Sequence, residues 1–594
     1  MCGIVGYVGN KKAQPVLMET LARLEYRGYD SCGVAIRGSP LTVYKGADRV
    51  GHLEANSPLV SGTIGIGHTR WATHGEVSEA NAHPHTDCRQ KIAVVHNGVI
   101  SNYQELKKQL TNEGHIFVSG TDTEVLPHLI EKYYEGDIEK AVKQALDEVQ
   151  GNYAILVVTE YENRMVAARN GNPLIIGIGP DGFITASDVP AVLNYAQKII
   201  YLEDNDLAVM GRDGLKITNE GVEVRREAFD SLWALEDLGK NGYEHHMLKE
   251  ISEQPRVVQN CLQQYNIKER AYPDAPPVLD GDTRNLTLIA CGTSCHAALV
   301  GKYIIEELTG IPVRVEVASE ISHRRHLVAT SKVIGLSQSG ETADVLVSLK
   351  RMRDQGAETV AITNVFKSTI SRIADQTIYT AAGPEVAVAA TKTFIAQLVA
   401  LIKLALSHPE VDPVIRGRLE AELEQLPRKI QEIIDNKAQI ERYAEYLAAA
   451  SQVFFIAKGV NVPIAYEGAL KVKEIAYLNA EGYCAGELKH GPFALLTPDS
   501  MVVALMPRDE NYEAMSITIQ EIRARKARLL CLAEAGDDAL DGSADYVLKL
   551  PPTLDLLSPI LNAVALQLLA YYTAKARACP IDFPRNLAKS VTVE

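Results

Sequence analysis

The chain has 594 residues, of which 46% are hydrophobic and 23% are charged, as in soluble globular proteins with several domains. Its 60 basic and 75 acidic residues give a net charge of −15, which disfavours a general grip on nucleic acid. The nine cysteines favour a reducing, cytoplasmic setting, and no uninterrupted apolar run reaches membrane-spanning length. We therefore expect neither a nucleic-acid nor a membrane partner.

Residues 1–240 predict layered antiparallel sheets covered by a few helices. Short apolar runs such as Tyr153–Thr159 and Met165–Arg169 alternate with turn residues, a pattern typical of hairpins. Helical periodicity occurs at Pro15–Leu24 and Asp137–Val149.

The pattern changes after residue 240. Tyr243–Leu262 is helical in pattern, and Ala271–Asp282 is rich in Pro, Asp and Gly, so residues 241–284 form a predicted helical linker. From Leu286 onward, strand, glycine-bearing turn and helix repeat, which predicts a parallel sheet with crossover helices. The apolar stretch Leu554–Leu569 contains polar residues and predicts a buried helix.

A weak internal repeat divides this second part. Three expected strands are followed later, at nearly constant spacing, by three similar ones: Leu286–Ala290, Val333–Leu336 and Thr359–Thr363 match Val453–Ala457, Met501–Leu505 and Ala527–Leu532. We predict two doubly wound α/β lobes, residues 285–425 and 426–580, joined by the charged helical stretch Arg416–Ala450 and followed by a tail, residues 581–594.

Cys2 follows the initiator Met1 and precedes Gly3. Removal of Met1 would leave a thiol and an α-amine on one residue, and the amine, with a pKa of about 8, suits proton transfer from the thiol. Cys2 is therefore a candidate nucleophile that carries its own base.

Five separated motifs support the interpretation of Cys2 as a nucleophile. In order, they resemble the N-terminal-nucleophile glutamine amidotransferases: Cys2–Gly6, Tyr26–Ser31, Gly67–Gly75, His96–Gly98 and Gly120–Glu124. The resemblance implies a glutaminase domain over residues 1–240, with L-glutamine as substrate. It also implies these roles: nucleophile Cys2; oxyanion donors Asn97 and Gly98; carboxylate clamp Arg70; ammonium partner Asp122; further substrate-site residues Thr73 and His74; and gating residue Trp71.

Two other patterns are weak metal signals. His83 and His85 flank Pro84 without a nearby acidic or cysteine partner, and Cys291 and Cys295 have no second pair. We interpret both as structural and expect no metal site and no cofactor.

Ser337–Thr342 follows an expected buried strand and precedes an expected helix, Ala343–Met352. Hydroxyls and a glycine at a helix N-terminus form a suitable phosphate cradle, but a simple helix cap explains the same residues. Cys291–Ser294 occupies the equivalent turn after the preceding strand and would add hydroxyls to the same anion.

These turns resemble the sugar isomerase (SIS) family of phosphosugar-binding domains. Further segments extend the resemblance of the whole chain to the glucosamine-6-phosphate synthase family: Glu385–Lys392, Glu467–Glu474, Gly486–Pro492 and Pro584–Glu594. The resemblance implies fructose 6-phosphate as the second substrate. It implies these roles: phosphate-site residues Ser294, Ser337, Gln338, Ser339 and Thr342; sugar contacts Val388 and Ala588; imine-forming Lys589; proton-transfer base Glu474, with Lys471 beside it; and ring-opening His490 from a neighbouring subunit.

Together, these resemblances predict ammonia transfer from Cys2 to the sugar through an apolar passage, and a homodimer formed through the SIS lobes. Three alternative functions are less consistent with the sequence. An amidophosphoribosyltransferase would need a paired-acidic motif after an apolar strand, and none occurs in residues 280–594. A regulatory sugar-phosphate sensor would not need Cys2, Arg70 and Glu474 intact, and a deaminase would not need the first 240 residues.

Overall fold

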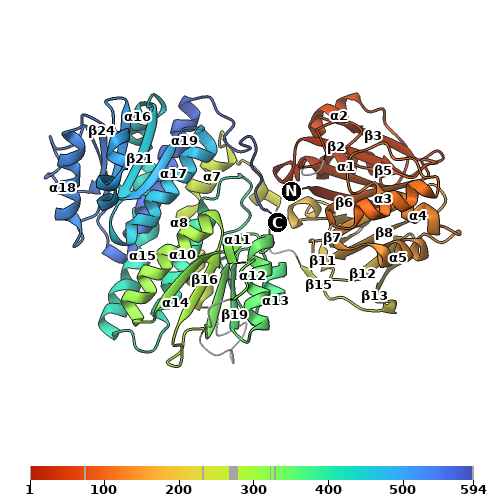
Figure 1. Ribbon diagram of the computed structural model, residues 1–594, viewed down its shortest axis with the longest axis horizontal. Helices are drawn as coiled ribbons and strands as arrows, with labels where there is room; N and C mark the ends of the chain where they lie inside the picture. The colour runs from red at the N-terminus through yellow and green to blue at the C-terminus, as the bar shows by residue number, and fades with distance from the viewer. Residues whose placement is uncertain are drawn as a thin grey trace. The chain divides into compact units, whose positions relative to one another are not determined.

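The computed structural model describes residues 2–72, 75–230, 233, 235–266, 278–321, 323–326 and 330–591. The chain forms two compact units (Figure 1). The first contains the chain up to Leu238 together with the end of the chain from Ala588, and the second contains Gly239–Leu587.

Two antiparallel sheets build the first unit. The first sheet has the strand order β15-β11-β9-β10-β1-β4-β2-β3, and the second has the order β14-β13-β12-β8-β7-β6-β5. Their bounds are β1 Gly3–Gly9, β2 Ser31–Ile36, β3 Thr42–Gly46, β4 Ile64–Arg70, β5 His85–Thr86, β6 Ile92–Ile100, β7 Gly151–Thr159, β8 Arg164–Asn170, β9 Ile175–Gly179, β10 Gly182–Ala186, β11 Lys198–Tyr201, β12 Asp206–Gly211, β13 Gly214–Asn219, β14 Val222–Glu223 and β15 Ala228–Asp230.

Alternation along the strands separates two apolar layers. In β6, Ala93 and Val95 face a core shared with the first sheet, whereas Ile92 and Val94 face a core shared with helices. Helices α3, α4 and α5 cover that outer face, and α1 packs on the first sheet (Figure 1). The helix bounds are α1 Ala13–Ala22, α2 Val50–Asn56, α3 Tyr103–Asn112, α4 Val125–Tyr133, α5 Ile138–Glu148 and α6 Val189–Val192.

The second unit contains two parallel sheets of identical topology. Their strand orders are β17-β16-β18-β19-β20 and β22-β21-β23-β24-β25. The strands are β16 Leu286–Ala290, β17 Val313–Val317, β18 Lys332–Leu336, β19 Glu358–Thr363, β20 Gln376–Tyr379, β21 Gln452–Ala457, β22 Ala480–Cys484, β23 Ser500–Met506, β24 Arg528–Glu534 and β25 Tyr546–Leu550. The order in which strands are added to each sheet reverses between β16 and β18 and between β21 and β23. Ligands of doubly wound sheets usually bind at such points.

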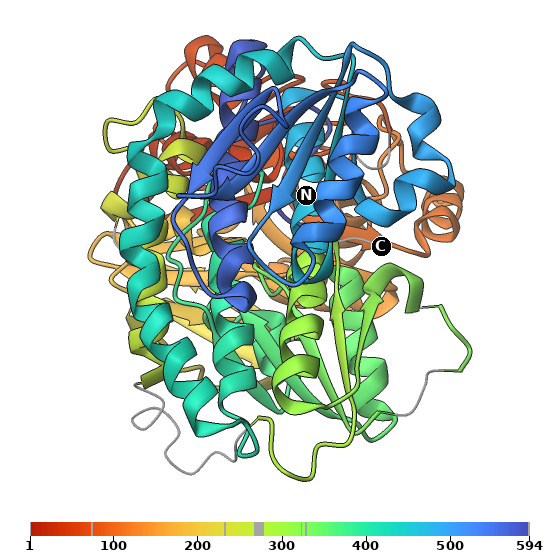
Figure 2. The same ribbon diagram turned by 90° about the vertical axis from the view of Figure 1, so that its left-hand side faces the viewer.

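Helices surround both sheets (Figure 2). One apolar core spans both lobes, and two smaller cores lie under α18 and under α11, α12 and α13. The bounds are α7 His246–Ser252, α8 Gln254–Asn266, α10 Gly292–Thr309, α11 Ala318–Ile321, α12 Ala343–Asp354, α13 Thr369–Ile373, α14 Lys392–Leu406, α15 Pro413–Asp435, α16 Lys437–Ala448, α17 Val462–Ala476, α18 Tyr512–Arg523 and α19 Ser558–Ala576. The stretch Asp555–Ala576 is long and apolar enough to cross a membrane, but 94% of its apolar window is buried in the protein. It is the core helix expected from the sequence.

The fold class is confirmed, with differences at element boundaries. All six strands of the predicted repeat are present, and their repeated order is the structural form of that repeat. The predicted helix Tyr243–Leu262 is divided into α7 and α8 at Glu253. The predicted boundary at residue 425/426 falls inside α15, which is continuous. Most of the predicted linker loop 271–282 lies outside the described residues.

Candidate active sites

Cys2 lies directly before β1, a central strand of the first sheet. Strand β4 pairs with β1 so that Gly3 lies opposite Thr69, which brings the residues after β4 beside Cys2. The backbone N–H of Trp71 donates to Cys2 Sγ at 3.3 Å, and the thiol lies 3.6 Å from the Trp71 carbonyl oxygen. The half-buried sulfur is therefore held by the backbone of one residue.

Asn97 reaches Cys2 from β6 of the second sheet. Its Nδ2 donates to the Cys2 carbonyl oxygen at 3.0 Å, and its Oδ1 lies 3.1 Å from His68 Nε2. His68 Nε2 also lies 3.0 Å from the His96 carbonyl oxygen. Because both neighbours of Nε2 accept hydrogen bonds, Nε2 carries the proton. The His68 N–H therefore fixes which end of the Asn97 amide faces Cys2.

Gly98, the next residue, has a backbone conformation that requires glycine. Its φ is +136°, and a Cβ at this position would lie 1.9 Å from the Asn152 carbonyl oxygen. The neighbouring Asn97 carbonyl accepts a hydrogen bond from Asn172 Nδ2 at 2.7 Å. Asn152 of β7 and Asn172, which follows β8, therefore hold the backbone of Asn97 and Gly98 in place.

Arg70 and Asp122 place opposite charges in the same region. Burial lowers the pKa of the Arg70 guanidinium, and the nearby carboxylates of Asp30 and Asp122 oppose that shift. Arg70 also donates to the carbonyl oxygens of Glu76 and Gly75, at 3.3 and 3.2 Å. Asp122 is buried and accepts a hydrogen bond from the Ile100 N–H at 2.8 Å. This pair has the charges needed for an amino acid's carboxylate and ammonium groups.

Of the other predicted glutamine-site residues, Trp71 packs edge-on against Tyr29, with ring centroids 5.6 Å apart. Thr73 and His74 lie outside the described residues.

His83 and His85 belong to a buried histidine cluster with His68 and His96. His83 stacks on His68 at 4.1 Å between centroids, and His85 Nε2 lies 3.0 Å from Thr121 Oγ1. Burial lowers the pKa of all four imidazoles, that of His68 to about 3, so they are neutral at pH 7. The cluster contacts Asn97 through His68 and the segment that contains Asp122 through His85 and His96.

The predicted phosphate residues follow the adjacent strands β16 and β18. Ser294 lies in the first turn of α10, which begins two residues after β16, and Ser337–Thr342 connects β18 to α12. Ser294 Oγ accepts from Gln397 Nε2 at 3.0 Å, and the hydroxyls of Ser337 and Thr342 are 2.9 Å apart. Both helix N-termini thus lie at the reversal point of the sheet, a position that suits anions.

The turn after β18 needs a glycine at position 340. Gly340 has a φ of +67°, and a Cβ there would lie 2.1 Å from Ser368 Oγ. Its N–H is bonded to Ser337 Oγ at 3.0 Å, and the Glu341 N–H to Ser339 Oγ at 3.2 Å. The alternative of a plain helix cap has less support, because Thr342 at the N-cap of α12 makes no side-chain cap bond. Gln338 belongs to the same turn, and its carbonyl oxygen accepts from the Asn364 N–H at 3.0 Å.

A charged network on α17 connects the two lobes. Lys471 Nζ donates to Glu474 at 2.5 Å and to Thr293 Oγ1 at 3.1 Å, and it lies 3.3 Å from Glu467. Glu467 also pairs with His296 of α10 at 2.7 Å. Burial by itself would lower the pKa of Lys471, but Glu467 and Glu474 outweigh it and raise the pKa, which favours the protonated lysine.

The remaining predicted residues are dispersed. Val388 donates its N–H to the Asp582 carbonyl oxygen at 3.0 Å. His490 is exposed at the end of the 3₁₀ helix η4, Ala485–His490. Ala588 and Lys589 belong to the first unit, whereas the other predicted sugar-site residues belong to the second.

Comparison with known proteins gives two domain types. The SIS domain model matches residues 282–407 and 446–576, and a glutamine amidotransferase domain model matches residues 68–194. A glutamine–fructose-6-phosphate aminotransferase (isomerizing) from Caldanaerobacter subterraneus is 44% identical over 613 aligned residues, covering all of both chains. The chain belongs to the glutamine–fructose-6-phosphate aminotransferase family. The aminotransferase of Symbiobacterium thermophilum is 45% identical, again over both full lengths.

The fold of the second unit is similar to that of a solved structure. The C-terminal domain of the Francisella tularensis glucosamine-fructose-6-phosphate aminotransferase is 34% identical, with a TM-score of 0.52. It covers 58% of this chain and is itself covered completely. The two SIS matches coincide with the two sheets of repeated topology.

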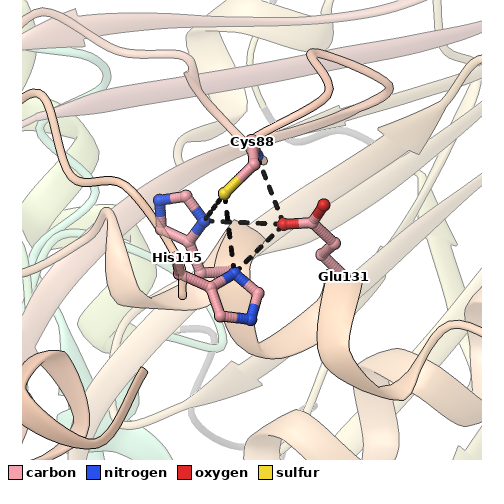
Figure 3. A group of neighbouring side chains, drawn as sticks. Cys88, His115 and Glu131 are labelled. Atoms are coloured by element: carbon pink, nitrogen blue, oxygen red, sulfur yellow. Dashed lines mark hydrogen bonds and ion pairs between the residues drawn. The ribbon is translucent and has the colours of Figure 1, made fainter. Parts of the chain in front are cut away.

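Sequence reasoning missed three kinds of residue in this aminotransferase family member. His68 lies within the Gly67–Gly75 motif, and Glu467 begins the Glu467–Glu474 motif. The family resemblances led to no predicted role for either residue. Glu467 stands four residues before Lys471, a helical spacing that signals a pair. A third group, Cys88, His115, His128 and Glu131, brings together ligand types typical of metal sites (Figure 3).

Proposed function

We propose that the chain hydrolyses glutamine at Cys2 and uses the ammonia to convert fructose 6-phosphate into glucosamine 6-phosphate, with glutamate as the second product. The observation that carries the glutaminase half is the Asn97 amide, oriented by His68 with its N–H group toward Cys2. Full-length relatives that bear the name of this reaction support the whole assignment.

The first half-reaction begins with loss of Met1, which frees the α-amine of Cys2. The amine takes the thiol proton, and the thiolate attacks the carboxamide carbon of glutamine. Asn97 and Gly98 stabilise the oxyanion, while Arg70 and Asp122 bind the α-carboxylate and α-ammonium groups. The C–N bond breaks as the amine returns its proton to the leaving ammonia, and water then hydrolyses the thioester to glutamate.

The second half-reaction begins with phosphate binding at the turn Ser337–Thr342, with Ser294 contributing from the adjacent strand end. Val388 and Ala588 contact the sugar through their backbone, and His490 of a neighbouring subunit assists ring opening. Lys589 forms an imine with the open-chain ketone, and ammonia displaces the lysine from that carbon. Glu474 then moves a proton from C1 to C2, which leaves an aldehyde at C1 and an amine at C2.

Lys471 has a supporting part in this scheme. Its cation lies 2.5 Å from Glu474 and favours the carboxylate form that a base requires. A protonated lysine is a poor nucleophile, so the imine is assigned to Lys589 and not to Lys471.

We further propose that ammonia passes to the sugar without release into water, where most of it would become non-nucleophilic ammonium. Trp71 is the proposed gate. The exposure of His490 is consistent with its use by a second subunit, and we propose a homodimer formed through the SIS lobes. We also propose a cytoplasmic location.

Product analysis tests both halves together. Wild type given glutamine and fructose 6-phosphate should release glutamate and glucosamine 6-phosphate in about equal amounts, with intact mass showing loss of Met1. Cys2→Ala should lose glutamine-dependent synthesis but retain synthesis from ammonium salts, and Cys579→Ser serves as the control for loss of a thiol. Glutamate release without amino sugar would overturn the synthase assignment. No glutamate from a folded protein that lacks Met1 would favour the regulatory alternative.

A further inference from the structure

Four side chains from three separate segments of the first unit converge on one point (Figure 3). Cys88 Sγ lies 3.6 Å from His115 Nδ1 and 3.5 Å from His128 Nδ1. Glu131 Oε2 lies 3.1 Å from His115 Nδ1 and 3.7 Å from His128 Nδ1. All four ligand atoms lie within 4.8 Å of one another, so each faces the same small volume.

These separations match those of a tetrahedral zinc ion. Zn–S bonds of about 2.3 Å and Zn–N or Zn–O bonds of about 2.1 Å place sulfur and nitrogen about 3.6 Å apart and nitrogen and oxygen about 3.4 Å apart. Both sulfur–nitrogen distances agree within 0.1 Å of this value, and the two nitrogen–oxygen distances fall on either side of it. One thiol, two imidazoles and one carboxylate are ligands that zinc prefers to calcium or magnesium.

Local structure holds each ligand in place. Cys88 follows Asp87, whose Oδ1 accepts from the backbone N–H groups of Lys91 and Ile92 at 2.6 and 2.7 Å and so fixes the turn between β5 and β6. His115 follows the end of α3, and its N–H is bonded to the Leu110 carbonyl oxygen at 3.0 Å. His128 and Glu131 stand three residues apart on one face of α4.

The contacts around the four ligands are mixed. The other ring nitrogen of His128, Nε2, is buried and lies 3.8 Å from Glu124, which is too far for a hydrogen bond. That carboxylate accepts hydrogen bonds from the Val118 and Ser119 N–H groups, both at 2.7 Å. The Ile116 N–H points to Cys88 Sγ at 3.5 Å, a contact that supports a thiolate.

The four side chains are buried to different extents, and the more exposed ones leave a path for a metal ion from solvent. The His128 side chain is only 1% exposed, whereas those of His115 and Glu131 are 13% and 17% exposed and Cys88 lies at the surface. With four protein ligands the coordination sphere is closed, which is typical of structural rather than catalytic zinc.

We propose that Cys88, His115, His128 and Glu131 bind one structural Zn²⁺ ion in the first unit. Binding displaces the Cys88 thiol proton to solvent and leaves both imidazoles neutral. The metal joins the loop before β6, the segment after α3 and the helix α4.

We expect the metal site to affect glutamine binding, because two of its ligands flank a segment of the proposed glutamine site. His115 and His128 stand at the two ends of a segment that contains Asp122, the proposed ammonium partner of glutamine. Metal removal should therefore raise the KM for glutamine more than it lowers kcat. This consequence rests on the proposed function, whereas metal binding itself does not.

Cobalt substitution gives a direct test of the ligands. Metal-free protein titrated with Co²⁺ should show a thiolate-to-cobalt charge-transfer band and tetrahedral visible bands that saturate at about one equivalent. Because the unblocked Cys2 is itself a chelator, the titration is repeated in Cys2→Ala, where the bands should persist. They should disappear in Cys88→Ser and persist in Cys579→Ser.

Zinc affinity provides an independent measurement. His115→Ala should weaken Zn²⁺ binding by more than the roughly 10–100-fold expected for loss of an outer-layer contact, while His52→Ala, at an exposed histidine, should leave it unchanged. Unchanged cobalt bands in Cys88→Ser, or bands lost in Cys2→Ala, would overturn the proposal. So would wild-type protein that retains less than about a tenth of an equivalent of zinc after equilibration and dialysis. Glutamine hydrolysis plays no part in these readouts, so their failure is distinct from failure of the proposed function.

Discussion

At the scale of single residues, the orientation of one amide governs the glutaminase site. The side chain of Asn97 presents an acceptor to His68 and a donor toward Cys2, and reversal of the amide would place two acceptors or two donors face to face. His68 is buried and neutral, so it holds the amide through a hydrogen bond and adds no charge beside the nucleophile. We therefore propose that His68 positions Asn97, the proposed oxyanion donor.

Replacement of His68 tests this positioning role. His68→Phe removes the N–H donor to Asn97, and we expect kcat for glutamine hydrolysis to fall by about 10²-fold with a small change in KM, since loss of one oxyanion donor costs about that much. His68→Gln restores a side-chain N–H and should recover part of the rate, and His52→Phe is the surface control. Synthesis from ammonium salts should be unaffected. Equal loss of both activities would show a general folding defect instead.

The buried histidine cluster predicts acid sensitivity of stability. The pKa of His68 is about 3 in the folded chain and about 6.5 when unfolded, so between these values the unfolded state binds more protons. Stability is then full above about pH 6.5 and falls as the pH decreases, by about 1.4 kcal/mol per pH unit for each such histidine.

Thermal unfolding between about pH 6.5 and pH 5 should show this slope, because the unfolded histidines take up most of their protons in this range. His83→Gln removes one proton uptake and should flatten the slope by about one proton, whereas His52→Gln, at an exposed position, should not. An identical slope in wild type and His83→Gln would contradict the prediction.

The sequence predicted Cys2, Arg70, Asn97 and Asp122 as site residues because they lie in short motifs with fixed order, and the structure brings Asn97 to Cys2. The sequence did not predict the hydrogen bond from His68 or the convergence at Cys88. The hydrogen bond depends on the packing of two sheets, and Cys88 is separated from His115 and His128 by 27 and 40 residues along the chain. Such spacings form no recognisable metal motif, and the packing of α4 against α3, β5 and β6 brings the ligands together.

At the scale of elements, α17 carries the charges of the sugar half along one face. Glu467 and Lys471 are separated by one helical turn, and their side chains are 2% and 1% exposed. A buried charge that loses its partner is costly, about 3–5 kcal/mol, because it is neither hydrated nor paired. The helix therefore depends on Glu467 to keep the Lys471 cation in place beside Glu474.

Glu467→Gln should weaken the second unit and its chemistry selectively. We expect a loss of stability of about 3 kcal/mol and strongly reduced synthesis from both glutamine and ammonium salts, with glutaminase activity retained. Lys473→Gln, at an exposed position on the same helix, is the matched control. Calorimetry and the two product assays provide the measurements, and wild-type synthesis in Glu467→Gln would refute the role of the pair.

The repeated topology was predictable from the sequence because buried parallel strands form continuous apolar runs, which Leu286–Ala290 and Val453–Ala457 illustrate. The extent of the connecting helices was misjudged, although one boundary has a sequence signal. The break at Glu253 between α7 and α8 precedes Pro255 in the first turn of α8, and proline is tolerated at the start of a helix but not in its interior. Glu253 also pairs with Lys392 of α14 at 2.7 Å.

At the scale of the whole molecule, the residues proposed for the sugar half-reaction are divided between the two units of the chain. The proposed imine-forming Lys589 and its neighbour Ala588 group with the first unit, whereas Glu474 and the phosphate turn belong to the second. Synthesis therefore depends on the full chain, and loss of the tail should separate the two activities.

Imine trapping decides which lysine attacks the sugar. Borohydride added with fructose 6-phosphate should reduce the imine and leave the sugar attached to the peptide that contains Lys589. Lys471 should remain unmodified, because Glu467 and Glu474 raise its pKa and keep it protonated. Lys589→Arg should abolish trapping and amino-sugar formation while glutamate release continues, and Lys575→Arg, at a partly exposed lysine, should change neither. An adduct on Lys471 would instead require that its neighbouring carboxylates lose their hold on the proton when the sugar binds.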